Sequence, residues 1–484
     1  GQTRDEEARK KIQKEINDNA VAAAEFAVPN EFDRMLAGIG GQSVNAFTSE
    51  EMIVYHNYFP PNQVEKWLDI YSERFINPVF RLFQSELETV YEEKNRAMDN
   101  FIFALLHNFN KNLYKNHPYG QQDLIGSTEH LKNPSLTKMY EYFEQYYVSN
   151  NMALILSGDF DAAKVMPLIK AKFGRLKRGT VPPFPEYKEA PFAGRELVVG
   201  RYTPVAAALI GFRTVPVGHR DGPALDVVNY FLSNNGGTGL LDRLSLDQKI
   251  LVSQLNTMRY ADHGASMLVV VPKIIGQSIK KAEKLVLEEI EKLHRGEITQ
   301  AQLTAAKLNL KQEFELEMEG LKSKALRVTN SFISGEPWEN VVAYPSQIEK
   351  VSLERIAEVS KKYYGKNYLI LQSKMGFPKK DKLSKPPYSP PIPKTTTKSA
   401  YAKHFDQLPS GTSQPHFVDF NTDVQQIQLA DHAHLFRVEN PSNNVFRLKF
   451  RYSIGKNSDP TLAYVAEYMG YLGTESQSTS EIRS

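Results

Sequence analysis

The chain has 484 residues, which is too long for one hydrophobic core, so two to four domains are expected. Its hydrophobic content of 41% and charged content of 24% are typical of soluble globular proteins, and no apolar run is long enough to span a membrane. The absence of cysteine excludes disulfides and thiolate chemistry, and a net charge of +3 gives no argument for nucleic acid or an anionic membrane as the main partner.

The N-terminal part of the sequence alternates between predicted helices and strands. A charged helix is predicted over 5–25, and β-rich sequence over 43–59 indicates strands. Apolar residues at helical spacing predict a helix over 61–75, and a helical pattern without proline or glycine continues from 80 to about 114. The apolar run "ALILSGDF" at 153–160 is typical of a buried strand.

Two internal repeats organise the rest of the chain. Residues 135–155 align without gaps with 352–372, and each copy reads as an amphipathic helix, a Tyr-Tyr pair, a turn and an apolar strand. More weakly, 211–232 resembles 449–472, as a strand ending in Phe-Arg, a polar turn and a helix. Strands mixed with helices favour an α+β class, and no phosphate-binding glycine motif occurs.

The repeats predict tandem copies of one α+β unit. Two long helices are expected in the second copy, over 276–295 and 299–333. Proline and lysine dominate the sequence after the second copy, which indicates an extended linker. The predicted boundaries are a first domain over 1–180, a second over 195–375, the linker over 376–415 and the start of a truncated third domain over 416–484.

The stretch "ELETVYEEKN" at 86–95 raises a question about chemistry. Glu86 and Glu93 are seven residues apart, which places both carboxylates on one face of a helix, two turns apart. Taken alone, this pattern is interpreted as the solvated face of an ordinary helix.

Several motifs in fixed order resemble the pitrilysin/insulinase (M16) zinc metallopeptidases. They are "GIGGQSVNAFTSEEMIVYHNYFP", "ERFINPVF", "ELETVYEEKNR", "HPYG", "YYVSNNMALILSGDFD" and "NNGGTGLLDRLSLDQKILVSQL". The resemblance implies tandem LuxS/MPP-type α+β domains, each a mainly antiparallel sheet with helices packed on one face. It further implies four such domains in two halves that enclose a chamber, so the other half of the parent protein is an expected partner.

In that family two histidines of an H-x-x-E-H motif and a glutamate on a later helix hold zinc. The resemblance implies that Glu93 is the third zinc ligand and that Glu86 supports it. The sequence contains no H-x-x-E-H, so no zinc and no catalytic base are expected in this chain. Either the zinc-bearing strand and helix lie upstream, with both ends cut from a longer protein, or the chain is a non-catalytic homologue. We favour the first explanation.

Two further segments match substrate-facing parts of the family. Asn45, Ala46 and Phe47 would offer a strand edge to an extended peptide, although a plain hairpin remains an alternative. Gly236 and Gly237 lie in "NNGGTG", which is interpreted either as a mobile loop facing substrate or as a turn that needs positive φ.

The expected function is part of a zinc-dependent metalloendopeptidase that hydrolyses peptides or small unfolded proteins within a closed chamber. The alternative is a non-catalytic subunit that binds peptide or braces a complex. The expected partners are a peptide substrate, the other half of the parent protein and a second copy in a possible dimer. Neither nucleic acid nor a membrane span is expected. The bacterial periplasm is the suggested location of the parent protein.

Overall fold

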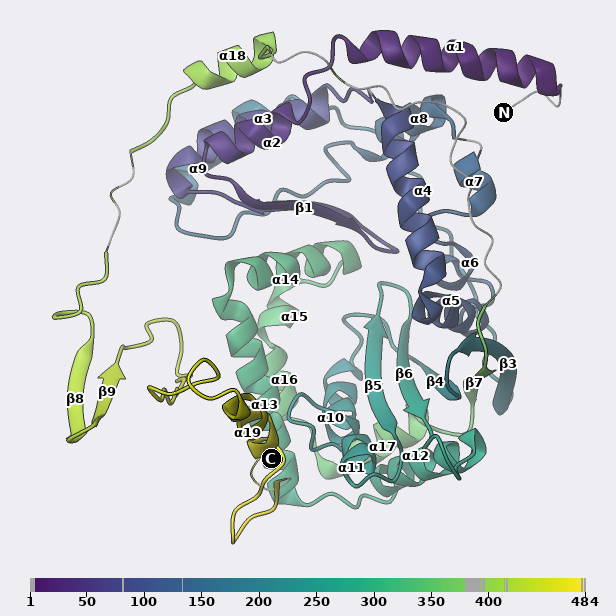
Figure 1. Cartoon of the computed structure of the whole chain (residues 1–484), viewed down its shortest axis with the longest axis vertical. Helices are drawn as coiled ribbons and strands as arrows, with labels where there is room; N and C mark the ends of the chain where they lie inside the picture. Colours follow the sequence, from purple (N-terminus) through teal and green to yellow (C-terminus); the bar gives the residue numbers. More distant parts are fainter. Residues whose placement is uncertain are drawn as a thin grey trace. The chain divides into compact units, whose positions relative to one another are not determined.

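The chain folds as two units, each described separately (Figure 1). Unit 1 comprises 1–189 and 378–415, and unit 2 comprises 190–377 and 416–484. No helix among the described residues is long and apolar enough to cross a membrane. The computed structural model describes residues 5–80, 82–132, 134–378, 393, 397–412, 414, 417–479 and 482.

Unit 1 begins with the charged helix and the hairpin that the sequence predicts, and with a short helix at 31–38 between them that it does not. Asp5 caps the first helix by accepting hydrogen bonds from the N–H groups of Glu7 and Ala8. The two strands pair antiparallel, with Phe47 opposite Val54. The elements are α1 (Glu6–Ala24), α2 (Glu31–Gly38), β1 (Gln42–Thr48), β2 (Ile53–Tyr58), η1 (Pro61–Gln63) and α3 (Val64–Ile76).

The long helix predicted from 80 to about 114 is wrong, because it is two helices. Asn100 leaves the helical region with φ −86° and ψ 113°, and its side chain accepts a hydrogen bond from the Ile102 N–H at 2.9 Å. Asparagine competes with the helix in this way and favours caps. The remaining helices are α4 (Phe83–Asp99), α5 (Phe101–Leu113), α6 (Pro118–Gln121), α7 (Thr128–Lys132), α8 (Leu136–Tyr146), α9 (Ala162–Phe173) and α18 (Ala400–Gln407).

Helix α18 lies within the segment that the sequence predicts to be an extended linker. Its Phe405 is 3% exposed and joins a core with Leu36 and Leu68. Its Tyr401 hydroxyl donates to Asp69 at 2.8 Å, and Lys172 of α9 reaches the same carboxylate at 2.5 Å. Asp69 therefore joins three helices that are far apart in the sequence. The linker residues 379–392 lie outside the described part of the chain.

Replacing Asp69 with alanine should destabilise unit 1. Lys172 and the Tyr401 hydroxyl would stay buried and lose the acceptor that they share, so we expect the free energy of unfolding to fall by about 2–3 kcal/mol.

The chain has two tryptophans, Trp67 in unit 1 and Trp338 in unit 2. Urea unfolding followed by Trp67 fluorescence in a Trp338→Phe background isolates unit 1. Asp18→Ala, on the exposed surface of α1, is the control and should leave the midpoint unchanged. An unchanged midpoint for Asp69→Ala would show that the three-helix junction contributes nothing.

Unit 2 is built on a five-stranded sheet in the order β3-β7-β4-β6-β5 (Figure 1). Only the β3–β7 pair is parallel. The predicted helix over 299–333 is broken at Gly320, whose ψ of 131° is extended. The elements are β3 (Arg195–Thr203), β4 (Ala207–Thr214), α10 (Gly222–Leu232), α11 (Leu240–Leu246), β5 (Val252–Arg259), β6 (Gly264–Val271), α12 (Ile279–His294), α13 (Gln300–Glu319), α14 (Leu321–Ser334), α15 (Trp338–Val342), α16 (Tyr344–Glu349), α17 (Leu353–Tyr363) and β7 (Tyr368–Met375).

Alternate side chains of the central strands form the core of unit 2. Ile210, Phe212 and Ile370 are fully buried and meet Leu225 and Val228 of α10 in one cluster. Figure 1 shows α10, α11, α12 and α17 gathered against this sheet. This is the α+β class that the sequence predicts, with a mainly antiparallel sheet.

The two units share an order of elements. Helix α2, hairpin β1–β2 and helices α3 and α4 in unit 1 correspond to α11, β5–β6, α12 and α13 in unit 2. Helix α8 corresponds to α17, and Ser135 caps the first as Ser352 caps the second. The Tyr147 hydroxyl meets the Tyr55 hydroxyl at 2.9 Å, as the Tyr364 hydroxyl meets Ser266 at 2.7 Å. The aligned repeat is therefore also a repeat of contacts.

The strand predicted at 153–160 is wrong, since residues 153–157 belong to no sheet among the described residues. In unit 2 the corresponding strand β7 lies between β3 and β4. The described part of unit 1 contains no counterpart of β3 or β4, so both ladder partners are missing from it. Leu154 and Leu156 still pack on the unit 1 core. The apolar pattern therefore predicted burial correctly and strand pairing wrongly.

The C-terminal segment forms a hairpin and a helix. These are β8 (Gln425–Ala430), β9 (Ala433–Arg437) and α19 (Thr461–Met469). The helix predicted by the second repeat is present, but its strand is not, because 446–452 pairs with no described strand. Phe446 and Phe450 are 82% and 78% exposed. The assignment of this segment to a third domain stays a prediction.

Candidate functional site

Glu86 and Glu93 lie on one exposed face of α4. Among the described residues neither side chain forms an ion pair or a hydrogen bond. The opposite face is anchored, because Leu87, Tyr91 and Lys94 are buried. The Tyr91 hydroxyl donates to the Leu131 carbonyl at 2.7 Å. The packing of the buried face therefore fixes which way the two glutamates point.

A partly buried charge network holds this helix in place. Lys94 is 4% exposed, and its ammonium lies 3.3 Å from one oxygen of Asp123. His107 of α5 lies 2.6 Å from the other oxygen. The His107 hydrogen bond, with the charge of Lys94, lowers the pKa of Asp123 against the effect of burial. No spacing in the sequence signals this network, because its members come from separate helices and a loop.

The described residues do not by themselves make a zinc site. No group of three His, Cys, Asp or Glu side chains in the described part of the chain is placed to hold a metal. Glu93 is one donor, and stable zinc sites need three or four. His117, the histidine of "HPYG", is fully buried and caps α6 through its Nδ1 atom, which accepts from the Tyr119 N–H at 3.2 Å. His432 and His434 lie exposed at the β8–β9 hairpin.

Asn45, Ala46 and Phe47 lie on β1, as the sequence predicts. Strand β1 has one neighbour, β2, so its other edge has no described strand beside it. The Ala46 N–H is hydrogen-bonded at 2.8 Å by the side chain of Asn45. Asn45 and Ala46 are exposed, and Phe47 is half-buried against His56. The open edge of the strand can pair with an extended peptide. A peptide that bonds to the Ala46 N–H would have to displace the Asn45 side chain.

The glycine-rich segment is an ordered turn between α10 and α11. The Asp242 carboxylate accepts from the backbone N–H groups of Asn234 and Gly239, both at 3.0 Å. Gly237 has φ +68°, which glycine adopts without steric cost. Gly236 is exposed at the tip of the turn. The geometry favours the turn interpretation of Gly236 and Gly237 and leaves their contact with substrate untested.

Helix α10 of unit 2 carries a polar cluster that sequence reasoning missed. Asp226 pairs with Arg259 of β5 at 2.7 Å and accepts from the Tyr344 hydroxyl at 3.2 Å. Burial and the Asp226 charge raise the pKa of Tyr344, so this hydroxyl stays protonated. On the same helix, Asn229 accepts from the Tyr364 hydroxyl. These groups satisfy one another and hold α10 in place.

Comparison with known families and proteins gives a consistent result. Residues 23–125 match the family model described as insulinase (peptidase family M16), and residues 135–310 match the one described as the peptidase M16 inactive domain. The zinc protease PqqE of Helicobacter pylori is 26% identical over 345 residues, which cover 69% of this chain and 76% of that protein.

Two solved structures show the same fold. A protease from Helicobacter pylori aligns with a TM-score of 0.64 at 24% sequence identity, over 71% of this chain and 84% of that one. The periplasmic protease PqqL from Escherichia coli aligns with a TM-score of 0.59 at 14% identity. That match covers 83% of this chain and 47% of the longer protein.

Proposed function

Since the chain belongs to the M16 peptidase family, we propose that it forms part of a zinc-dependent endopeptidase that hydrolyses peptides or small unfolded proteins in a closed chamber. Unit 1 would contribute the third zinc ligand, Glu93, with Glu86 supporting it. The histidines and the catalytic base must come from an H-x-x-E-H segment that this sequence does not contain.

The observation that carries this proposal is the difference between the two units. In unit 2, α10 packs against α13, and Tyr230 of α10 lies beside Asn309 and Glu313 of α13. Helix α4 is the counterpart of α13. Helix α1 precedes α2 as α10 precedes α11, but it is mostly exposed, with Ala24 buried, and does not take the packed place of α10. A helix in that place would face α4. Glu86 and Glu93 are exposed on α4 without described partners, so they suit a ligand role there.

The peptide would bind along the open edge of β1. Backbone groups around Asn45, Ala46 and Phe47 would pair with an extended substrate, which gives affinity with little sequence selectivity. Gly236 and Gly237 of unit 2 would be further contacts for substrate. The match to about half of the longer Escherichia coli protease favours a second, similar half as partner. A dimer of shorter chains is the other way to close a chamber.

The alternative function is a non-catalytic subunit that binds peptide. It is favoured by the match of 135–310 to the M16 inactive domain and by the lack of a three-ligand cluster in the described residues. Under this alternative, adding an H-x-x-E-H segment would give neither zinc binding nor activity. One reconstitution experiment therefore distinguishes the two proposed functions.

The chain by itself should bind no stoichiometric zinc. Glu93 is one donor and cannot retain the ion against dialysis. Mass spectrometry of the dialysed protein for metal, with the protein concentration from absorbance, measures the ratio. We expect far less than one zinc per chain, both in the wild type and in Glu93→Gln. One zinc per chain in the wild type would mean that ligands other than those of the family pattern hold it.

A further inference from the structure

One end of the unit 2 sheet gathers exposed apolar side chains and lysines. The strand register defines this end, since Thr203 pairs with Met375 and Val252 pairs with Val271. The C-termini of β3, β6 and β7 and the N-termini of β4 and β5 therefore lie together here. The connecting loops there are 204–206, 247–251 and 272–278. We refer to these loops and the adjoining strand ends as the basic–apolar end.

The apolar part protrudes most at the loop between β6 and α12. Ile275 is 88% exposed, the highest value among large apolar side chains in the described part of the chain, and Ile274 is 77% exposed. Beside them the Leu251 N–H pairs with the Val271 carbonyl at 3.0 Å, which brings Leu251 next to the loop. The other exposed apolar residues of this end are Val205, Val252, Met375 and Phe377.

The charges at this end are almost all positive. Lys273, Lys280 and Lys281 are exposed and form no ion pair among the described residues. Its loops contain a single carboxylate, Asp247, which lies 3.1 Å from the ammonium of Lys249. Arg201 and Lys374 are exposed on the neighbouring strand ends.

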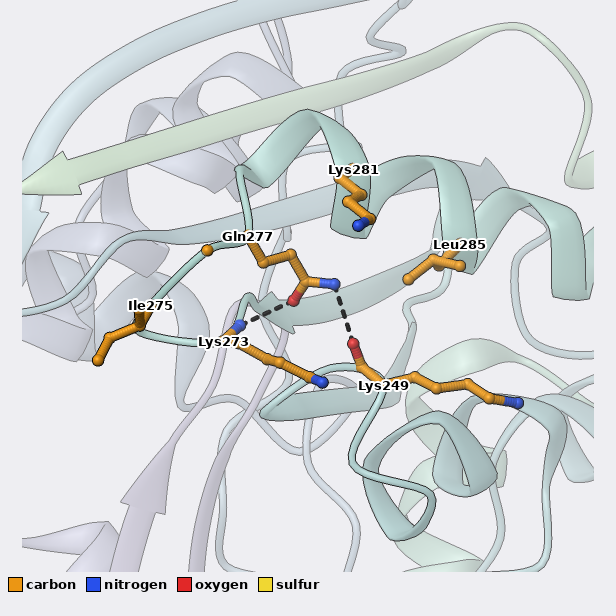
Figure 2. A pocket seen from close by; sticks show the side chains of 7 residues that line it. Lys249, Lys273, Ile275, Gln277, Lys281 and Leu285 are labelled. Atoms are coloured by element: carbon orange, nitrogen blue, oxygen red, sulfur yellow. Dashed lines mark hydrogen bonds between the residues drawn. The ribbon is translucent and has the colours of Figure 1, made fainter.

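The loop is held in this shape by its own hydrogen bonds (Figure 2). The Gln277 side chain accepts from the Lys273 N–H at 2.8 Å and donates to the Lys249 carbonyl at 2.9 Å. Gly276 has φ +77°, which turns the chain immediately after Ile275. Around Gln277 lies a cavity of about 370 Å³ lined by Lys249, Lys273 and Lys281. Ile275 and Leu285 also line this cavity, so the apolar tip and the lysines border the same hollow (Figure 2).

We propose that the basic–apolar end binds the surface of an anionic phospholipid bilayer. Ile274 and Ile275 insert between the headgroups, and lipid phosphates bind beside Lys249, Lys273 and Lys281. Exposed aliphatic side chains flanked by lysines favour binding to a membrane surface. The free energy of inserting the apolar groups and that of attracting anionic lipid add together. A convex tip of two isoleucines suits a soft interface better than the flat, larger patch of a stable protein contact. This inference does not depend on the proposed peptidase function.

Binding of the full chain to lipid vesicles tests the proposal. We expect the chain to sediment with vesicles of phosphatidylcholine mixed with phosphatidylglycerol and not with phosphatidylcholine alone, and to dissociate as salt is raised. The double variant Ile274→Ser/Ile275→Ser should bind about tenfold or more weakly. Lys273→Glu/Lys281→Glu should lose the preference for phosphatidylglycerol. The controls are Leu308→Ser, at an apolar site on α13 that is 64% exposed, and Lys322→Glu on α14, and both should bind as the wild type does.

The absence of cysteine allows a second readout that is specific to the loop. Ile275→Cys labelled with an environment-sensitive fluorophore should shift to the blue on adding anionic vesicles, and labelled Leu308→Cys should not. The segment 417–472 also exposes apolar side chains, so the variant differences, and not binding alone, decide the result. Equal binding by Ile274→Ser/Ile275→Ser, or an unshifted label at 275, would overturn the proposal. Loss of self-association in that variant, without any effect on vesicle binding, would instead assign the surface to a protein contact.

Discussion

Glu93→Gln should abolish most of the peptidase activity of a protein in which unit 1 is preceded by a strand–strand–helix segment carrying H-x-x-E-H. We call this form the motif-completed protein. A neutral amide is a poor zinc ligand, so the site would lose one of three protein donors. Glu86→Gln should reduce the rate less, by about 10–100-fold, because it orients the site and does not bind the ion. Both changes keep side-chain volume, so stability should barely change.

The measurement is the hydrolysis rate of a fluorogenic peptide by both variants, with circular dichroism spectra to confirm folding. Glu92→Gln, on the same helix but a different face, is the matched control and should retain the wild-type rate. If Glu93→Gln keeps the full rate while the motif-completed protein is active, α4 presents an ordinary solvated face. If the motif-completed protein is inactive although folded, the non-catalytic alternative is favoured.

Asp221→Ala should cause the largest loss of stability in unit 2. Asp221 is 1% exposed at the start of α10 and accepts from Lys362 at 2.8 Å, from the Tyr363 hydroxyl at 2.5 Å and from Arg355. It therefore ties α10 to α17. Removing it leaves Lys362 and the Tyr363 hydroxyl without their acceptor, whereas Arg355 keeps Glu358 at 2.7 Å, so we expect a cost of about 3 kcal/mol. Trp338 fluorescence during urea unfolding, in a Trp67→Phe background, reports unit 2.

The same carboxylate gives a pH dependence with a defined sign. Burial opposes ionisation of Asp221, but the Lys362 and Tyr363 hydrogen bonds outweigh it and hold the pKa well below its ordinary value of 3.8. A lowered pKa contributes stability above the ordinary value, and that stability is lost as the pH falls below it. The difference between wild type and Asp221→Ala should therefore be constant near neutral pH and shrink in acid. Asp247→Ala, an exposed aspartate in the same unit, is the control. A difference that stays constant into acid would contradict the charged role of Asp221.

The sequence predicted those parts of the fold whose signals are local. Apolar periodicity predicted α3, composition predicted α1 and the strands β1 and β2, and the aligned repeat predicted α8 and α17. Breaks set by one residue were missed, since Asn100 and Gly320 each end a helix that periodicity alone would continue. Helix α18 was missed because its apolar residues Tyr401 and Phe405 are few and follow a proline-rich stretch.

Features that depend on distant partners were harder to predict. The apolar stretch 153–157 has the composition of a strand, but pairing needs neighbours that the described part of unit 1 lacks. The Lys94–Asp123–His107 network and the Asp226–Arg259 pair each join separate elements, so no spacing in the sequence signals them. The positions of Glu86 and Glu93 on one face followed from helical geometry, whereas their role came from family resemblance and stays a prediction.

The zinc content of the motif-completed protein, with and without Glu93→Gln, tests the central claim most directly. The proposed function predicts that the unsubstituted motif-completed protein retains one zinc per chain after dialysis. The Glu93→Gln variant should lose most of its bound zinc under the same conditions. The Glu92→Gln variant should retain as much zinc as the unsubstituted motif-completed protein. Full retention of zinc by Glu93→Gln would contradict the assignment of this glutamate and, with it, the role proposed for unit 1.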